Sequence, residues 1–306
     1  MNQPIAMTVL DQRQKAVLRP ILYADIFDFP LTQAEVYRFI EIKTTPAEVE
    51  QLLLQAVEAG QLAVVEGFFS LPHRTELAPK RQERERASAL LWPKAGRYGR
   101  WLAALPFVRM VAVTGSLAVD NPRDGVDDID FLVVTRPGRL WMCRAMMVML
   151  VRLGHLGGVH LCPNYIVTEN RLSFDSQDFF TAREVIQMQP LYGEALYRQM
   201  VQANAWIARF FPHGSQPSTQ RLADDLTPAQ QGLKRVGEFI LAGVLGNRLE
   251  SIVQRYQVAK HTRLAEHYGQ RDRVVFNADE CKGHYDGHKR RAMAAYRRRM
   301  QEASVE

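Results

Sequence analysis

The spacing of hydrophobic positions in the first 60 residues predicts three helices. Apolar residues between positions 10 and 27 recur with a period near 3.6, which is typical of an amphipathic helix. Thr32 with Glu35 has the spacing of a capping box and predicts the start of a second helix. Thr45 with Glu48 repeats this signal, with a proline between them at the first helical position, and predicts a third helix.

Two short β-like segments follow these helices, at residues 62–65 and 68–71, and a Glu-Gly pair between them predicts a tight turn. Three helices and a hairpin in this order indicate a winged-helix-like domain over residues 1–79. The third helix carries glutamates and no lysine or arginine, so the phosphates of DNA would repel it. We therefore expect a protein-contact or structural role for this domain, and no DNA binding.

The pattern changes to strand, turn, strand, helix, strand between residues 108 and 168, after a basic, partly helical connector. From residue 178 onward the pattern is helical almost to the end, with a polar linker, HGSQPST, at residues 213–219. Thr227 and the proline after it predict the start of one helix that runs towards residue 268. The sequence thus predicts an α+β protein of three parts. They are the winged-helix-like domain, a core with a mixed sheet and flanking helices at 80–175, and a helical domain with a basic C-terminal helix at 176–306.

Composition narrows the class of protein. The chain has 306 residues, of which 47% are hydrophobic and 24% charged, which excludes a disordered or low-complexity chain. Its three cysteines show no C-x-x-C spacing, so we expect neither a disulfide scaffold nor a cysteine zinc site, and a cytoplasmic location. The first residues lack a signal-peptide pattern, and charges interrupt the longest apolar stretch, so no membrane association is expected.

Positive charge is concentrated in two segments. The net charge is +6, and residues 80–100 and 289–299 hold a large share of the lysines and arginines. Without these two segments the rest of the chain carries more acidic than basic residues. Two basic patches on an acidic protein indicate an anionic partner such as a nucleotide, RNA or DNA, and the alternative is that both are solvated helix faces.

The segment VAVTGSLAVDNPRDGVDDIDFLVV, residues 111–134, holds the candidate chemistry. An apolar strand ends at Gly115-Ser116, and a polar loop leads to Asp128 and Asp130 at the start of the next strand. Strand residues two apart share a face, so the two carboxylates project together and require a cation between them. Mg²⁺ suits such a pair because it takes one or two carboxylates and completes its shell with phosphates and water. Glycine and serine backbone at a helix start can hold the phosphates.

This segment resembles the signature of the DNA polymerase β-like nucleotidyltransferase superfamily, in which Gly-Ser, a spacer and Asp-x-Asp join two strands. The spacer here, residues 117–127, is close to the usual length. With GSLA, DDIDFLVV, LCPNY and TAREV, most of the chain also resembles a group of bacterial nucleotidyltransferase-domain proteins. The resemblance implies a polymerase-β-like core that uses Mg²⁺ or Mn²⁺ and an NTP, with ATP favoured. It implies that Asp128 and Asp130 are catalytic and bind the metal, and that Gly115 and Ser116 bind the triphosphate.

The chain departs from this family at the third carboxylate, which most active members carry on a later strand. The corresponding strand, residues 159–167, contains no Asp or Glu. Three residues could supply the missing base or metal ligand: His160, Asn164 and Glu184. A histidine can act as a base, whereas an asparagine can only ligate through its carbonyl oxygen. Each of the three also has a purely structural interpretation.

Three hypotheses follow from the sequence. The first is a nucleotidyltransferase that moves an NMP from an NTP to an unidentified acceptor hydroxyl on a small molecule, a protein or an RNA. The second is a catalytically weak nucleotide sensor or partner-binding protein that keeps the fold, which the missing third carboxylate favours. The third is a nucleic-acid-modifying enzyme that uses residues 289–299 as a phosphate track.

Overall fold

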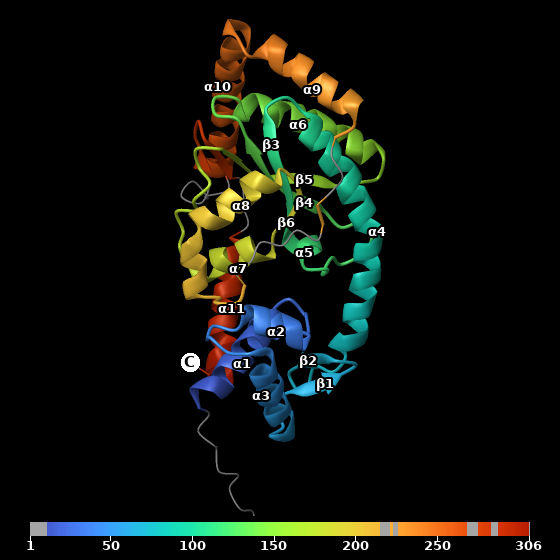
Figure 1. Cartoon of the computed structure of the whole chain (residues 1–306), viewed down its shortest axis with the longest axis vertical. Coiled ribbons are helices and arrows are strands. Elements are labelled where there is room, and N and C mark those ends of the chain that lie inside the picture. Colours follow the sequence, from blue (N-terminus) through green and yellow to red (C-terminus); the bar gives the residue numbers. More distant parts are fainter. Residues whose placement is uncertain (1–10, 215–220, 223–225, 268–274, 283–286, 306) are drawn as a thin grey trace, which may run out of the picture. The chain divides into compact units, whose positions relative to one another are not determined.

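The computed structural model describes residues 11–214, 221–222, 226–267, 275–282 and 287–305. Within these ranges the fold is α+β, with eleven α-helices, a two-stranded sheet and a six-stranded mixed sheet (Figure 1). The chain forms two compact units. We call them the helical unit (Met1–Gln82, Trp206–Ser215 and Lys289–Glu306) and the sheet unit (Glu83–Ala205 and Gln216–His288).

The helical unit begins with the three helices that the sequence predicted. They are α1 (Gln12–Asp25), α2 (Gln33–Phe39) and α3 (Pro46–Glu58). Both predicted capping boxes are present, since the threonine at each N-cap and the glutamate three residues later bond each other's backbone N–H groups. The structure adds a third, which opens α1 and pairs Asp11 with Gln14.

A β-hairpin follows, formed by β1 (Ala63–Val65) and β2 (Phe68–Ser70). Its turn residues Glu66 and Gly67 have φ angles of 54° and 81°. Positive φ at both central positions matches the right-handed twist of paired strands, which explains the Glu-Gly signal in the sequence. The predicted hairpin is confirmed.

The C-terminal helix α11 (His288–Glu302) packs into the helical unit. Its Tyr296 meets Tyr23 of α1 edge to face, with 5.3 Å between ring centroids. Arg299 forms an ion pair with the buried Asp25 of α1. The sequence placed residues 176–306 in one helical domain, whereas in the structure the described part of that segment is divided between both units.

The sheet unit is built on six strands in the order β6-β3-β4-β5-β8-β7. Strands β4 and β5 are parallel, and every other neighbouring pair is antiparallel. The strands predicted at residues 108–168 are β3 (Val108–Thr114), β4 (Ile129–Thr135) and β5 (Leu161–Thr168). Helix α6 (Leu140–Leu156) is the crossover that a parallel pair requires.

Three strands lie where the sequence pattern predicted only helix. They are β6 (Gln189–Tyr192), β7 (Val275–Phe276) and β8 (Glu280–Lys282). Each is four residues or shorter, too short to show a two-residue period, and each forms only by pairing with the sheet. The prediction of an almost entirely helical C-terminal half was therefore wrong.

The other helices of the sheet unit flank these strands. Two short helices, α7 (Phe179–Gln187) and α8 (Glu194–Ala203), lie on either side of β6 in the sequence. The expected single helix after Thr227 is two helices, α9 (Pro228–Leu241) and α10 (Val244–His267). Helix α4 (Leu77–Ala104) is continuous and runs through the predicted connector. The predicted linker at 213–219 lies mostly outside the described residues.

The core of the sheet unit comes from the apolar faces of β3 and β4 and from α6. Val111, Phe131 and Trp141 are fully buried there. Trp141 also donates its indole N–H to the carbonyl oxygen of Asn277, at 2.9 Å. None of the helices that the structure describes combines the length and the apolar character needed to cross a bilayer.

Candidate functional site

The end of β3 and the start of β4 bring the predicted site residues together. The two strands are antiparallel, and Thr114 pairs with Asp130. The chain leaves β3 through the short helix α5 (Gly115–Ala118), which lies next to β4 (Figure 1), and the Gly115 backbone lies against the Asp130 carboxylate. Strand pairing therefore places next to each other two motifs that are eleven residues apart in the sequence.

Gly115 is required by its contact with Asp130. Its φ angle is +67°, a conformation that side chains rarely adopt. A Cβ atom at this position would also overlap the Oδ2 atom of Asp130. The backbone at the start of α5 and the Asp130 carboxylate of β4 can approach this closely only because the residue is glycine.

Strand β5 holds the other side of the Asp130 carboxylate. Asp130 pairs in register with Cys162, whose thiol donates a hydrogen bond to it. The Nδ2 atom of Asn164 lies 3.3 Å from Asp130 Oδ1. Asn164 reaches this position because the register shifts next to it, a bulge that the Pro163 in mid-strand signals in the sequence.

Asp127 orders the loop between the two motifs. Its Oδ2 atom accepts hydrogen bonds from the backbone N–H of Arg123, at 2.9 Å, and from the Ser116 hydroxyl, at 3.4 Å. This is the loop role predicted for it. Asp128 follows it and stays exposed, with 66% of its side chain accessible, so a ligand can reach its carboxylate.

Asp130 lies among acidic groups. Its pKa is raised to about 7, chiefly by burial and then by the nearby carboxylates of Asp128, Glu184 and Asp127, while the Cys162 hydrogen bond acts in the opposite direction. A carboxylate in such a place favours either a proton or a cation. The arrangement can therefore attract a metal ion.

Glu184, one of the three residues considered for the missing base or metal ligand, comes to this cluster from α7. Its side chain is open to solvent, yet its surroundings desolvate it enough to raise its pKa to about 7. The charges of Arg183 and Lys282 act in the opposite direction. Lys282 belongs to β8, a strand that sequence reasoning missed, and is thus an additional cation near the site.

His160 faces Asp128 rather than Asp130. Its Nδ1 atom lies 3.9 Å from Asp128 Oδ1, and its half-exposed ring meets the ring of His155 edge to face, at 4.8 Å. The structure thus gathers all the predicted site residues around the β3–β4 junction. Those around Asp130 are Gly115, Asn164 and Glu184, and those on the open side are Ser116, Asp128 and His160.

The carboxylates of this site suit a metal ion whose coordination shell is completed by oxygen atoms of a substrate. Among the described residues, no three His, Cys, Asp or Glu side chains are placed to hold a metal by themselves. Two carboxylates, one of them half-buried among other acids, suit Mg²⁺, because this ion keeps water and phosphate oxygens in its shell.

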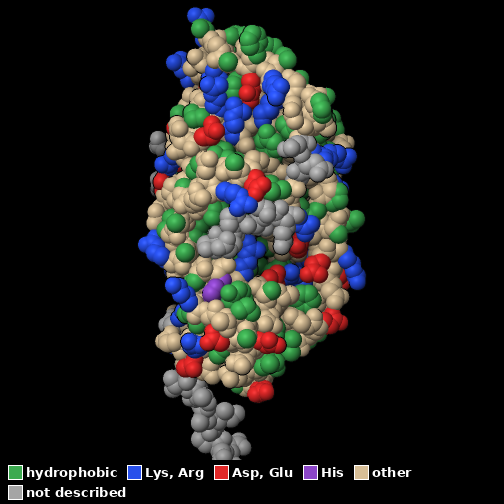
Figure 2. Space-filling view, in the orientation of Figure 1, with side chains coloured by type: hydrophobic (Ala, Val, Ile, Leu, Met, Phe, Trp, Pro, Cys, Tyr) green, Lys and Arg blue, Asp and Glu red, His purple; other side chains and the backbone are tan. Residues whose placement is uncertain are grey.

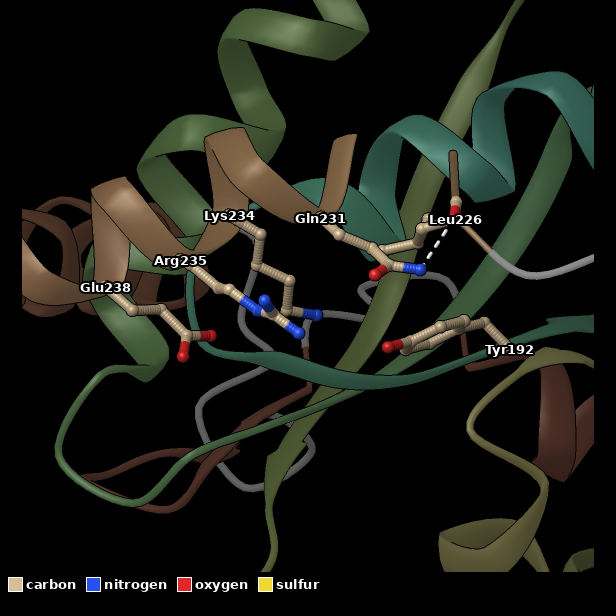
Figure 3. A pocket seen from close by; sticks show the side chains of 6 residues that line it. All are labelled: Tyr192, Leu226, Gln231, Lys234, Arg235 and Glu238. Carbon is tan, nitrogen blue, oxygen red and sulfur yellow. Dashed lines mark hydrogen bonds between the residues drawn. The ribbon is translucent and has the colours of Figure 1, made fainter. Parts of the chain in front are cut away.

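A separate cavity of about 280 Å³ lies under α9 (Figure 3). Lys234, Arg235 and Glu238 extend from α9 towards Tyr192 of β6. Lys234 is buried and donates to the carbonyl oxygens of Ala103 and Val108, so it supports the fold. Tyr192 pairs with β3 three residues before Thr114, so this cavity is at a different part of the sheet from the carboxylates.

The basic segment at residues 80–100 supplies internal contacts. Lys80 pairs with Asp28, and Arg81 pairs with Glu35 and stacks on Phe29. In the sheet unit, Arg84 contacts Asn121 and Lys94 donates to the Gly125 carbonyl, so both hold the loop beside the site. These four cations stabilise the protein's own structure. The second basic segment lies on α11, where Arg290, Arg297 and Arg298 are exposed.

Comparisons of this chain with protein-family models, with curated proteins and with solved structures found no match.

Proposed function

We propose that this protein is a Mg²⁺-dependent nucleotidyltransferase that moves an NMP from an NTP to an acceptor hydroxyl. One observation carries the proposal: the Asp130 carboxylate lies against the bare backbone of Gly115, close to the carboxylates of Asp128 and Glu184. Acidic groups and phosphate-binding backbone at one place suit a substrate that arrives as a metal–triphosphate complex. The core is then polymerase-β-like, as the sequence resemblance implies.

The residues divide into metal-binding and phosphate-binding groups. Asp128 and Asp130 would hold Mg²⁺ or Mn²⁺, which supplies charge neutralisation for the phosphates and for the leaving pyrophosphate. Ser116 and the Gly115 backbone would bind the triphosphate, with ATP the favoured nucleotide. Lys282 adds positive charge on the same side of the sheet unit, near Glu184.

The transfer is an in-line displacement. The acceptor oxygen forms a bond to the α-phosphorus, the bond from that phosphorus to the bridging oxygen breaks, and pyrophosphate leaves. The acceptor's proton goes to Glu184, whose pKa of about 7 suits a general base near neutral pH. His160 is the second candidate base, because it lies beside Asp128.

The experiment is transfer of label from α-³²P NTPs into fractionated cell extract, with Mg²⁺ or Mn²⁺. Asp128→Asn and Asp130→Asn should each lower transfer on the order of 10³-fold, because the reaction depends on electrostatic stabilisation. Asp124→Asn is the matched control. Asp124 is an exposed aspartate of the same loop, and its carboxylate accepts a hydrogen bond from the Val126 backbone N–H. Wild-type transfer by Asp130→Asn would contradict the proposal.

A second pair of variants separates the two candidate bases. Glu184→Gln should lower kcat and change the shape of the pH–rate profile near pH 7, while nucleotide binding is retained. His160→Gln should leave that profile in place. The reverse result would assign the base to His160.

The second candidate function is a nucleotide sensor that binds NTP without consuming it. The absence of Asp and Glu from β5, where active relatives of this fold carry a third carboxylate, favours it. Calorimetric NTP binding that depends on Asp128 and Asp130, with no pyrophosphate release in any extract fraction, would support the sensor over the enzyme.

We also infer that the domain at residues 1–79 is winged-helix-like and contacts protein rather than DNA. Helix α3 presents Glu50 and Glu58 on its exposed face and contains no Lys or Arg. Its other glutamate, Glu48, pairs with Arg13. A helix of this charge would be repelled by a phosphate backbone.

A further inference from the structure

Helices α9 and α10 carry a row of large apolar side chains that nothing in the described chain covers. They form a hairpin whose helices meet at Ala242 and Gly243 (Figure 1). Figure 2 shows apolar side chains interspersed with Lys and Arg at this end of the sheet unit. The exposed fractions are 57–62% for three residues of α9 and 37–69% for four of α10. These seven are Leu233, Val236, Ile240, Leu245, Leu249, Ile252 and Tyr256. Phe239 and Val244, near the point where the two helices meet, are exposed as well, at 86% and 68%.

The spacing of these residues is that of a coiled-coil seam. On α10 they follow one another at intervals of four, three and four residues, and on α9 at three and four. Along α10, from Leu245 to Tyr256, this is the a/d pattern, two positions in seven, which is narrower than the face a helix buries in a core or lays on lipid. On α9 the exposed Phe239 widens the stripe beside Ile240. The pattern indicates that the covering element is itself a helix.

The two helices cannot turn these stripes inward. On the opposite face of α10, both carboxylate oxygens of Glu250 accept the backbone N–H groups of Trp141 and Met142, at 2.9 and 2.8 Å. On the opposite face of α9, Lys234 donates to two carbonyl oxygens and Glu238 accepts the Phe107 N–H. Rotation would leave these buried polar groups without partners.

The area that these seven side chains expose is close to the area that one protein buries in a protein–protein interface. Seven side chains that expose on the order of 100 Å² each give about 700 Å², close to the ~800 Å² that one partner buries in a standard interface. Apolar patches of this size on a soluble protein mark sites of association.

Charge identifies the partner's chemistry. Arg248 and Arg255 are exposed, lie seven residues apart and border the α10 stripe on one side. They occupy the flanking position of the heptad that selects partners by charge. A second copy packed antiparallel on the same seam would bring these arginines against their own equivalents, which is repulsive.

We propose that the α9–α10 hairpin docks an amphipathic helix of another protein, with apolar residues at three- and four-residue spacing and Asp or Glu along one flank. The inference is independent of the proposed transfer reaction. Docking would place such a partner on the face of the hairpin opposite Lys234 and Glu250.

The test uses two synthetic helical peptides with leucine at every a and d position, which differ only in their flanking residues, glutamate in one and lysine in the other. Binding to the full chain is measured by fluorescence anisotropy. Wild type should bind the glutamate peptide at least about tenfold more tightly, and the Arg248→Glu/Arg255→Glu double variant should reverse this preference. Equal binding of the two peptides, or binding of neither, would overturn the proposal.

Two single variants locate the binding surface. Ile252→Lys should weaken binding of the glutamate peptide at least about tenfold, and it is expected to fold because that side chain is 64% exposed. Leu153→Lys is the matched control, because Leu153 is 61% exposed on α6 and should leave binding unchanged. Light scattering measures the oligomeric state. If wild type is a dimer that Ile252→Lys dissociates, and if neither peptide is preferred, the apolar row is covered by a second copy of the chain and the proposal is overturned.

Discussion

At the residue scale, the Asp130 carboxylate lies between the backbone of Gly115, the first residue of α5, and two side chains of β5, Cys162 and Asn164. The contact with glycine has two separate requirements, a positive φ angle and space for the carboxylate. Gly138 shares only the first of them, since its φ is +69° and a Cβ there would meet nothing within 4 Å.

We therefore expect Gly115→Ala and Gly138→Ala to differ. Both should lose about 1–2 kcal/mol of unfolding free energy because alanine is strained at positive φ. Gly115→Ala should in addition displace Asp130 and weaken Mg²⁺–NTP binding at least about tenfold. Urea denaturation and calorimetric titration of each variant measure the two effects. Equal nucleotide binding by both variants would show that the close approach at Gly115 has no role.

The residues of this site show what local sequence predicts. Gly115-Ser116 and Asp128-Ile129-Asp130 could be read as one site, because each motif lies at the end of an apolar strand. Lys282 could not, because it lies on a three-residue strand whose formation depends on pairing with β5.

At the element scale, α4 holds the loop that joins the two motifs. The indole N–H of Trp92 donates to Asp120 Oδ1 at 2.8 Å, Lys94 donates to the Gly125 carbonyl oxygen, and Arg84 contacts Asn121. Arg84 and Lys94 of the basic segment therefore hold the loop between the two motifs in place.

Trp92→Phe should loosen that loop. It removes one hydrogen bond, worth about 1 kcal/mol, while most of the ring packing remains. We expect faster amide hydrogen exchange at residues 119–127 and a raised KM for the nucleotide. Trp101→Phe, on the same helix and 46% exposed, should change neither. Identical exchange in the two variants would show that α4 does not order the loop.

Within the helical unit, one buried carboxylate ties α11 to α1. Asp25 is 4% exposed and lies 3.2 Å from Arg74 and 2.9 Å from Arg299. Each arginine also has an exposed acidic partner, Glu76 and Glu302 respectively.

Asp25→Ala should destabilise the helical unit by about 3 kcal/mol, because it leaves two arginines without their buried partner. Glu76→Ala and Glu302→Ala should each cost less than about 1 kcal/mol, because exposed ion pairs contribute little. Chemical denaturation measures the cost, and hydrogen exchange of α1 and α11 locates it. A loss from Asp25→Ala no larger than that from the exposed pairs would refute this assignment.

The sequence predicted best those helices and strands that are long or that begin and end at a clear local signal. Capping boxes and a Glu-Gly turn act within a few residues, so α2, α3 and the β1–β2 hairpin could be predicted with their starts. The break between α9 and α10 has no comparable local signal beyond Gly243, and the sequence predicted one continuous helix there.

At the scale of the whole molecule, the ionised Asp130 carboxylate lowers the free energy of unfolding. The pKa of Asp130 is raised from its ordinary 3.8 to about 7, so between these pH values the folded protein binds a proton that the unfolded chain releases. Its contribution to stability is therefore present below about pH 4 and is lost as the pH rises to about 7. An acidic site of this kind trades stability for function.

Asp130→Asn should accordingly be more stable than wild type above pH 7, by on the order of 1–3 kcal/mol, although it is inactive in transfer. Below about pH 4 the two proteins should converge, because Asp130 is then protonated in both folded and unfolded chains. Denaturation curves from pH 4 to 8 measure this, with Asp124→Asn as a control that follows wild type. Parallel curves for Asp130→Asn and wild type would contradict the assigned pKa.

The sequence by itself determined the α+β class, the capped helices and hairpin of the first 70 residues, the strands β3 to β5 and the pairing of Gly-Ser with Asp-x-Asp. All of these depend on interactions between residues close in the chain. Only the tertiary structure decided which distant groups join them: Glu184 and Lys282 at the carboxylates, α11 in the helical unit, and the outward seam of α9 and α10. These outcomes depend on strand pairing and burial between segments far apart, for which a single sequence carries no local signal.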